Sequence, residues 1–166
     1  MTTSTTTRSI EIDATAAQVY AFVSDLERLM GSIPAIRHVV IAAVDTSEEG
    51  ATTYAWTTTV GIGPLSRDVN GSTTREQCVP GHGVVYRHSM GLKTLETFTV
   101  EPATRGTRLS LTVSLTSPVP FLDRLAVLVA SKGRGQADYA DRVLAEIKQQ
   151  LEEGHDARPS VPTANR

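Results

Sequence analysis

The chain has 166 residues, of which 40% are hydrophobic and 20% charged, and this suits one folded globular domain. Its formal net charge is −2, so charge gives no reason to expect a nucleic acid or an anionic membrane as a partner. Cys78 is the only cysteine, which excludes a disulfide or a cysteine-based metal site within one chain and fits a reducing compartment.

No secretory signal and no membrane span are expected. Residues 1–9 are mostly threonine and serine, without an apolar segment behind a charged start. The longest apolar run, Leu125 to Ala130, is far shorter than the roughly 20 residues of a transmembrane helix. A cytoplasmic location follows by elimination.

Both ends are expected to be disordered. Residues 1–7 form a polar tract, and residues 154–166 contain Pro159, Pro162 and almost no apolar residue. Burial cannot offset the entropy lost on ordering such segments. The folded domain is therefore expected over residues 8–153.

The first elements are a strand and a pair of short helices. Ile10 and Ile12 alternate with polar neighbours, which predicts a strand over residues 8–13. Thr15 to Gln18 has the spacing of a capping box, and apolar residues recur at helical spacing from there to Met30. A break near Ser24-Asp25 would divide this stretch into two helices.

The rest of the chain predicts strands followed by a long helix. Turn residues separate β-branched or alternating segments at residues 37–44, 51–60, 65–79, 84–90, 92–100 and 107–116. Residues 121–151 have helical spacing, but Gly133 and Gly135 each cost roughly 1 kcal/mol in a helix interior. These glycines would either leave room beside a ligand or break the segment into two helices.

The fold class is therefore α+β: a curved antiparallel sheet of about seven strands around a long C-terminal helix, with two short helices after the first strand. A curved sheet that closes on one helix tends to leave a space between the two, and small ligands bind in such spaces.

Three segments resemble the START-like, or SRPBCC, superfamily, which includes polyketide cyclases, lipid-transfer domains and the birch-pollen-allergen fold. Residues 10–20 and 23–28 are similar to its usual first strand and helix, and Gly106-Thr107-Arg108-Leu109 is similar to the start of its last strand. The resemblance covers residues 9–153. It implies a helix-grip fold and an internal cavity for a lipid, polyketide or quinone-type molecule.

Three shorter segments resemble one branch of this superfamily. Ile33-Pro34, residues 60–65 and Gly133-Arg134-Gly135 are similar to features of the carbon monoxide dehydrogenase G branch. That resemblance would imply a hydrophobic, quinone-type ligand.

Motifs for familiar catalytic and cofactor sites are missing from the sequence. There is no nucleophile elbow and no P-loop. Gly61-Ile62-Gly63 is followed by Pro64 and by no helix, which favours a turn over a dinucleotide site. The four histidines are scattered singly, so we expect no metal site, and no cofactor is implied.

The predicted hairpin that turns at Gly91 carries the most informative polar residues. A turn centred there places Tyr86 opposite Glu96 and His88 opposite Thr94, all on the more apolar face. Inside the domain, burial would raise the pKa of Glu96, which could then serve as an acid or a base. A slip in register would instead expose these residues, and a Tyr–Glu pair could also simply satisfy itself.

Further ligand contacts are expected on neighbouring elements. Trp56, the only tryptophan, is either simple core or cavity wall. Arg67 facing inward would suit a carboxylate or phenolate on the ligand, although an outer, solvated position is more common for arginine. The expected ligand-binding residues are Tyr54, Trp56, Thr58, Arg67, Tyr86, His88, Glu96, Phe98, Leu111, Val113, Leu125 and Val129.

Three functions remain open from the sequence. The first is non-catalytic binding or carrying of a small hydrophobic molecule. The second is an enzyme of the polyketide cyclase or dehydratase type, with Tyr86, His88 or Glu96 as acid–base groups. The third is a protein-interaction or co-chaperone-like domain. A homodimer is compatible with the sequence, but nothing in it requires one.

Overall fold

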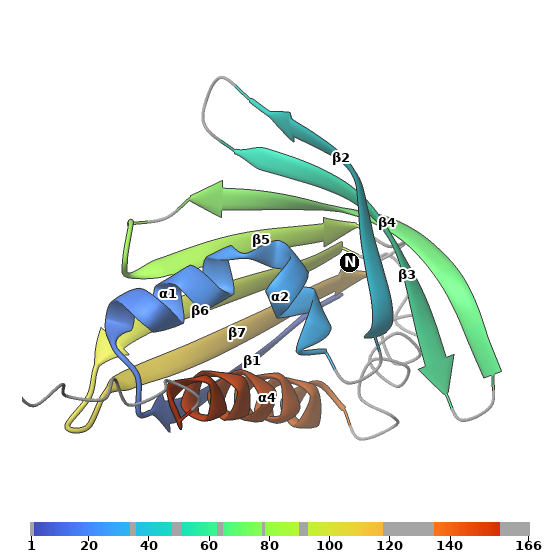
Figure 1. Cartoon of the computed structure of the whole chain (residues 1–166). Coiled ribbons are helices and arrows are strands. Elements are labelled where there is room, and N and C mark those ends of the chain that lie inside the picture. Colours follow the sequence, from blue (N-terminus) through green and yellow to red (C-terminus); the bar gives the residue numbers. More distant parts are fainter. Residues whose placement is uncertain are drawn as a thin grey trace, which may run out of the picture.

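The structure is a computed structural model that describes residues 2–33, 36–47, 51–62, 65–77, 79–89, 93–117 and 135–156. Its seven strands form one antiparallel sheet in the order β1-β7-β6-β5-β4-β3-β2, and the sheet curves around helices α1, α2 and α4 (Figure 1). The helix-grip class predicted from the sequence is therefore confirmed. The strands are β1 (Thr2–Ile12), β2 (Ile36–Thr46), β3 (Thr52–Ile62), β4 (Leu65–Gln77), β5 (Gly83–Ser89), β6 (Lys93–Pro102) and β7 (Thr107–Ser117). The helices are α1 (Ala16–Ser24), α2 (Leu26–Gly31) and α4 (Gln136–Asp156).

β1 begins earlier than the expected boundary at Arg8. It pairs with β7 from Thr2 onward, and hydroxyl pairs such as Thr5–Ser114 (3.0 Å) and Thr7–Thr112 (2.9 Å) join the outer faces of the two strands. Threonine favours strands because its branched side chain packs well on a pleated surface. Composition alone therefore misjudges residues 2–7, because their stabilisation comes from a distant strand.

The two short helices form as the sequence predicts. Thr15 caps α1, its side chain accepting from the Gln18 backbone N–H while the Gln18 side chain accepts from the Thr15 N–H. The chain then leaves helical geometry at Asp25, whose carboxylate accepts from the backbone N–H groups of Glu27 and Arg28 and so caps α2. One acidic residue thus ends the first helix and starts the second.

α4 starts directly after Gly135. Gly135 has φ +97°, a left-handed conformation that a helix interior does not allow and that glycine adopts without strain. The backbone carbonyl of Gly135 accepts from the Tyr139 N–H at 3.1 Å, so this residue is where the helix begins. The sequence left open whether the helix is continuous through the two glycines; α4 begins after Gly135, and residues 118–134, with Gly133 and Arg134 among them, lie outside the described residues.

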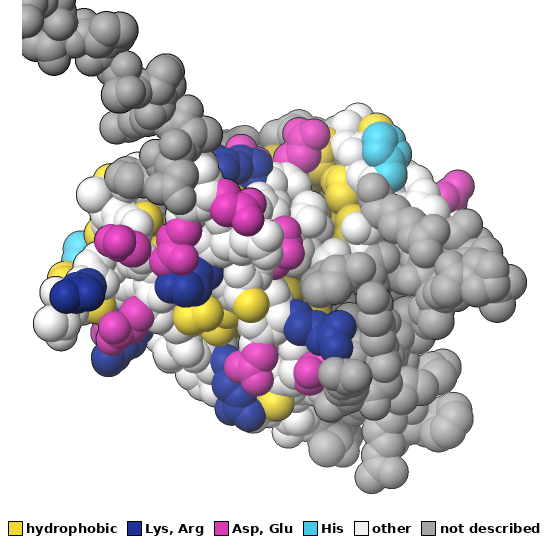
Figure 2. Space-filling view, turned by 60° about the horizontal axis from the view of Figure 1, so that its bottom comes forward, with side chains coloured by type: hydrophobic (Ala, Val, Ile, Leu, Met, Phe, Trp, Pro, Cys, Tyr) yellow, Lys and Arg dark blue, Asp and Glu magenta, His cyan; other side chains and the backbone are white. Residues whose placement is uncertain are grey.

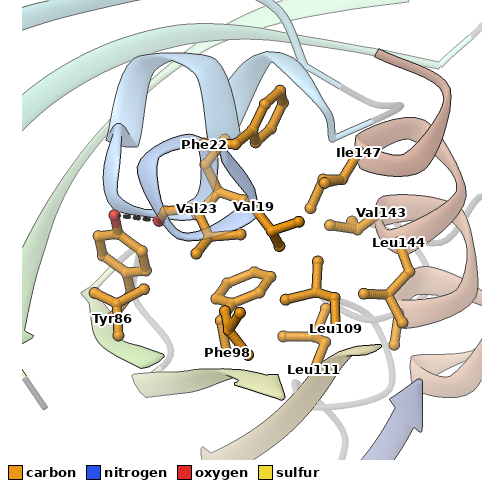
Figure 3. Packing of buried hydrophobic residues seen from close by; sticks show 14 of the residues in the cluster. Val19, Phe22, Val23, Tyr86, Phe98, Leu109, Leu111, Val143, Leu144 and Ile147 are labelled. Atoms are coloured by element: carbon orange, nitrogen blue, oxygen red, sulfur yellow. Dashed lines mark hydrogen bonds between the residues drawn. The ribbon is translucent and has the colours of Figure 1, made fainter. Parts of the chain in front are cut away.

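The hydrophobic core lies between the helices and one half of the sheet. Figure 3 shows apolar side chains of α1 and α4 packed against those of β6 and β7. The largest fully buried side chains of the core are Tyr86, Phe22, Phe98, Ile12, Leu109, Leu111, Leu144, Ile147, Val19, Val23, Val84 and Val113. Burial of a large apolar side chain contributes about 1.5–3 kcal/mol, so this cluster accounts for why α1 and α4 stay on the sheet.

The outward side of the molecule over α4 is polar. Figure 2 shows basic and acidic side chains interspersed on this face, with no broad area of one sign. Pairs one helical turn apart, such as Arg142–Asp138 and Lys148–Glu152, account for part of this pattern. Among the described helices, none is long and apolar enough to cross a membrane.

Candidate functional site

A chain of polar side chains runs across the inner face of the sheet, one from each of four neighbouring strands. Trp56 Nε1 on β3 donates to Thr73 Oγ1 on β4 at 2.8 Å, and Thr73 Oγ1 lies 2.8 Å from His88 Nδ1 on β5. His88 Nε2 lies 3.4 Å from Glu96 Oε2 on β6. Tyr139 on α4 donates to Glu96 Oε1 at 2.7 Å. We call these five residues the inner polar network.

The strand register brings the network together. β5 and β6 pair with Tyr86 opposite Glu96 and His88 opposite Thr94, so the register predicted for the hairpin is confirmed. β4 pairs with β5 so that Thr73 lies opposite His88. Because residues opposite each other in an antiparallel pair share a face, these side chains point to the same side of the sheet.

Trp56 anchors one end of the network. Its indole can only donate, so the Thr73 oxygen accepts from it. The Thr73 hydroxyl still has a hydrogen and a second lone pair, so the direction of its bond to His88 Nδ1 depends on the His88 tautomer. When Thr73 donates, a neutral His88 carries its proton on Nε2, the nitrogen nearest the Glu96 carboxylate. At 3.4 Å this last contact is long for a hydrogen bond, and it is an ion pair only when His88 is protonated. Nε2 makes no hydrogen bond with the described residues.

Glu96 is buried, with only 4% of its surface exposed. Burial raises the pKa of its carboxyl, but the electrostatic attraction of the nearby His88 ring and the hydrogen bond from Tyr139 outweigh burial and lower the pKa below its ordinary value of 4.5. The expected upward shift is therefore wrong in direction, because sequence reasoning counted burial and not the two partners. Glu96 is ionised at neutral pH and is an acceptor there, not an acid.

Tyr86 has a different partner from the one its position suggests. Although it lies opposite Glu96, its hydroxyl donates to the Val23 carbonyl of α1 at 2.7 Å (Figure 3). The tyrosine that satisfies Glu96 is Tyr139. Burial is the main cause that raises the pKa of both hydroxyls above 10, and for Tyr139 the negative charge of Glu96 adds to it.

Arg75 on β4 points inward and holds the end of α1. Its guanidinium donates to the Ser24 carbonyl at 3.0 Å and lies 5.9 Å from the Tyr54 ring centroid. The last carbonyls of a helix have no partner within the helix and carry partial negative charge, which a cation satisfies. Arg75 is thus engaged with the protein itself.

Beyond the network, the inner face continues as an apolar surface on β2 and β3. Val39 lies opposite Thr58, and Ile41 lies opposite Trp56. Val39, Ile41 and Tyr54 pack against the core but stay only partly buried. The Thr58 hydroxyl donates to the His38 carbonyl and so adds no free polar group to this face. We call Val39, Ile41, Tyr54 and Trp56 the β2–β3 wall.

The structure places the expected ligand-binding residues in three groups. Trp56, His88 and Glu96 belong to the inner polar network, and Tyr54 belongs with Trp56 to the β2–β3 wall. Those buried elsewhere on the inner face are Thr58, Tyr86, Phe98, Leu111 and Val113. The side chain of Arg67, and the whole of Leu125 and Val129, lie outside the described part of the chain.

Two members of the network were not proposed from the sequence as site residues: Thr73 and Tyr139. Thr73 belongs to the alternate residues of β4 that point inward, and Tyr139 places a hydroxyl group on the apolar face of the last helix. A buried tyrosine hydroxyl requires a partner, and that requirement is the signal that could have paired Tyr139 with an inward carboxylate.

No cluster of metal-binding side chains occurs among the described residues. A pocket of about 350 Å³ lies between β1 and α4, away from the network, and its lining includes Ile10, Lys148 and Glu152. Lys148 is already bonded to Glu152 at 2.6 Å and to the Glu11 carbonyl at 2.8 Å, so this pocket offers no free cation.

Comparison with known proteins identifies the family. Residues 3–152 match the family described as polyketide cyclase/dehydrase and lipid transport, so the chain belongs to that family. No curated protein sequence matches the chain.

Solved structures with the same fold cover almost the whole chain. The Zhui aromatase/cyclase from Streptomyces sp. R1128 has a TM-score of 0.70 at 12% identity, with 96% of this chain and 100% of that chain covered. A START superfamily protein from Mycobacterium smegmatis has a TM-score of 0.62 at 17% identity, with 90% and 97% covered. The di-domain ARO/CYC StfQ from the steffimycin biosynthetic pathway has a TM-score of 0.61 at 15% identity, with 93% and 53% covered.

Proposed function

We infer that this protein binds or carries a small hydrophobic molecule against the inner face of its sheet, between the β2–β3 wall and the inner polar network. The observation that carries this inference is the contrast between the two halves of that face. On β6 and β7, side chains such as Phe98 and Leu111 are fully covered by α1 and α4. On β2 and β3, apolar side chains of the same face remain partly exposed.

The chemistry of this face favours an apolar ligand. Val39, Ile41 and Tyr54 offer partly exposed aliphatic and aromatic surface, as small-molecule sites usually do, and the buried Trp56 supports them from behind. Arg75 is satisfied by Ser24, so its charge is already used by the protein. Each square ångström of apolar ligand surface removed from water contributes about 25 cal/mol, so contacts with these side chains alone can provide binding.

The inner polar network supports binding more than catalysis. Thr73, His88, Glu96 and Tyr139 point their polar atoms at one another. A general base must reach the proton that it abstracts, and here Nδ1 of His88 faces Thr73 while Nε2 faces Glu96. In this arrangement the network fixes the shape of the face.

The second candidate is an enzyme of the cyclase or dehydratase type. It is favoured by the fold shared with an aromatase/cyclase and by a histidine–carboxylate pair on the inner face. Movement of His88 Nε2 away from Glu96 would make it available to a substrate. Glu96→Gln should then abolish turnover of a candidate polyketone in protein that circular dichroism shows to be folded, and unchanged turnover would remove Glu96 from the mechanism.

The ligand classes that we propose are lipids, polyketides and quinones. A protein of the carbon monoxide dehydrogenase G branch would be expected to carry a quinone-type molecule. A polyketide-processing protein would instead bind a folded aromatic or poly-oxo chain. Each class has a distinct mass, so a bound molecule would distinguish them directly.

The test is native mass spectrometry of freshly purified protein and of two matched variants. Val39→Lys places a charge on the inner face of β2, whereas Val40→Lys places the same charge on its outer face, where Val40 is 50% exposed. We expect a bound lipophilic molecule in wild type and in Val40→Lys, and its loss in Val39→Lys. Protein that is empty in all three forms, even after incubation with a lipid, an anthraquinone and a menaquinone analogue, would contradict the proposal.

A further inference from the structure

The two edges of the sheet are protected differently. At the β1 edge, side chains of α4 bond to the strand backbone: Lys148 donates to the Glu11 carbonyl at 2.8 Å, and Gln136 donates to the Ser4 carbonyl at 3.4 Å. β2 is the strand at the opposite edge, and no described strand or helix continues the ladder beyond it (Figure 1). An uncovered edge presents unpaired backbone groups that another strand can bond.

The sequence of β2 does little to discourage such pairing. Between His38 and Asp45 it contains no charged residue and no proline, the two kinds of residue that commonly protect edges. Val40, half exposed on the outer face, is one of two large hydrophobic side chains exposed in the described part of the chain. Two irregularities would discourage a partner: a register shift between Ile36 and His38, and a second one, within the apolar segment, between Ile41 and Ala43.

The second register shift makes the strand complementary to itself. His38 and Asp45 are an odd number of residues apart, so in a regular strand they would lie on opposite faces. Because the register shifts between them, His38 pairs with Thr59 and Asp45 with Thr53, and both of these β3 residues lie on the outer face. His38 and Asp45 therefore share the outer face, where both are exposed.

The outer face of β3 is identified by its hydroxyl pairs. Thr59 donates to Asp68 Oδ1 at 2.8 Å, and Thr53 Oγ1 lies 3.1 Å from Thr74 Oγ1. Trp56 and Thr58, of the opposite parity, are buried on the inner face. The assignment of His38 and Asp45 to one side of β2 therefore follows from contacts on the neighbouring strand.

We propose that a second copy of this chain adds its β2 to this edge in antiparallel register, about a two-fold axis between Ile41 and Ala42. In that register His38 of each copy lies opposite Asp45 of the other, so an imidazole N–H faces a carboxylate at each end of an apolar centre. The interface is isologous, as in most homodimers, and joins two sheets into one. Pairing of single edge strands buries little surface, so the dimer is weak and concentration-dependent.

The test is sedimentation velocity over a concentration series on the full-length chain. Wild type should show a monomer–dimer equilibrium, and Val40→Lys should raise its dissociation constant at least about tenfold because a lysine on an edge discourages strand pairing. Val79→Lys is the matched control: Val79 is the other exposed hydrophobic residue, at 61%, but it lies in the β4–β5 connection. Its dissociation constant should equal that of wild type.

A charge exchange makes the test specific for the register. Asp45→Lys should weaken the dimer because it replaces the acceptor that faces His38, and the double variant His38→Asp/Asp45→Lys should restore it because a carboxylate and an ammonium group then face each other. Wild type that stays monomeric throughout would overturn the proposal and leave this edge to a strand of another protein. Equal dissociation constants for Val40→Lys and Val79→Lys, or no rescue by the double variant, would also overturn it. Circular dichroism confirms that each variant is folded before it is compared.

Discussion

Tyr139 donates a 2.7 Å hydrogen bond to Glu96 and thereby joins the first turn of α4 to β6. This bond, with the 3.4 Å contact of His88, keeps an ionised carboxylate inside the domain. A buried carboxylate without hydrogen-bond partners destabilises the folded state. Because α4 supplies the Tyr139 partner, the position of α4 and the ionised state of Glu96 depend on each other.

Loss of the Tyr139 hydroxyl should destabilise the protein. In Tyr139→Phe the ring still fills its place, but Glu96 keeps only the His88 contact. Leaving a buried acceptor without its donor costs about 1–3 kcal/mol, which urea denaturation would measure. Tyr20→Phe is the control, because Tyr20 is only partly buried and outside the network; a loss as large in the control would contradict this account.

Glu96 should make stability sensitive to acid. Because its pKa in the folded protein is lowered below 4.5, its contribution is fully present above about pH 4.5 and is lost as pH falls through the folded value. Below that pH, the free energy of unfolding should therefore fall more steeply with decreasing pH in wild type than in Glu96→Gln, by up to about 1.4 kcal/mol per pH unit. Parallel pH curves for the two proteins, measured by denaturant titration, would argue against a lowered pKa.

Tyr86 and Tyr139 should produce the opposite behaviour in alkali. Their pKa values are raised above 10 by burial, so their contribution is present below about pH 10 and is lost as pH rises towards the folded values. Absorbance near 295 nm should show these two of the four tyrosines ionising only when the protein unfolds. All four titrating together in folded protein would refute their burial.

Arg75 should matter more to stability than Arg87 on the neighbouring strand. Arg75→Met removes the partly buried hydrogen bond to the Ser24 carbonyl, and bonds from charged donors contribute about 1.5–3 kcal/mol. Arg87→Met removes an exposed ion pair with Glu76, and such pairs contribute about 0–1 kcal/mol. Equal losses in thermal denaturation would show that Arg75 does not hold the end of α1.

Periodicity and local chemistry predicted most of the fold. Thr15 and Gln18 are close in sequence, so their capping box is visible without tertiary information, and the break at Asp25 follows from the same kind of signal. The hairpin register around Tyr86 and Glu96 was predictable because it depends on the turn between two adjacent strands. The ordering of residues 2–7 was not predictable from local sequence, because it depends on β7.

Only part of the candidate site could be predicted from the sequence, because the rest depends on contacts between distant elements. Tyr86, His88 and Glu96 lie on one hairpin, so their shared face follows from parity. Which tyrosine reaches Glu96 depends on where α4 lies, and no local pattern supplies that. The wrong pKa direction for Glu96 has two origins: the effect of His88, which parity had already placed on the same face, was not counted, and Tyr139 lies on a distant helix.

The most direct test of hydrophobic binding at the inner face uses Trp56, the only tryptophan, which belongs to the β2–β3 wall. Fluorescence of wild type would be titrated with the neutral apolar probe N-phenyl-1-naphthylamine, with Val39→Lys and Val40→Lys in parallel. Our account predicts saturable energy transfer from Trp56 to the probe in wild type and Val40→Lys, and its loss in Val39→Lys. No saturable change in wild type, or an equal response from Val39→Lys, would contradict it.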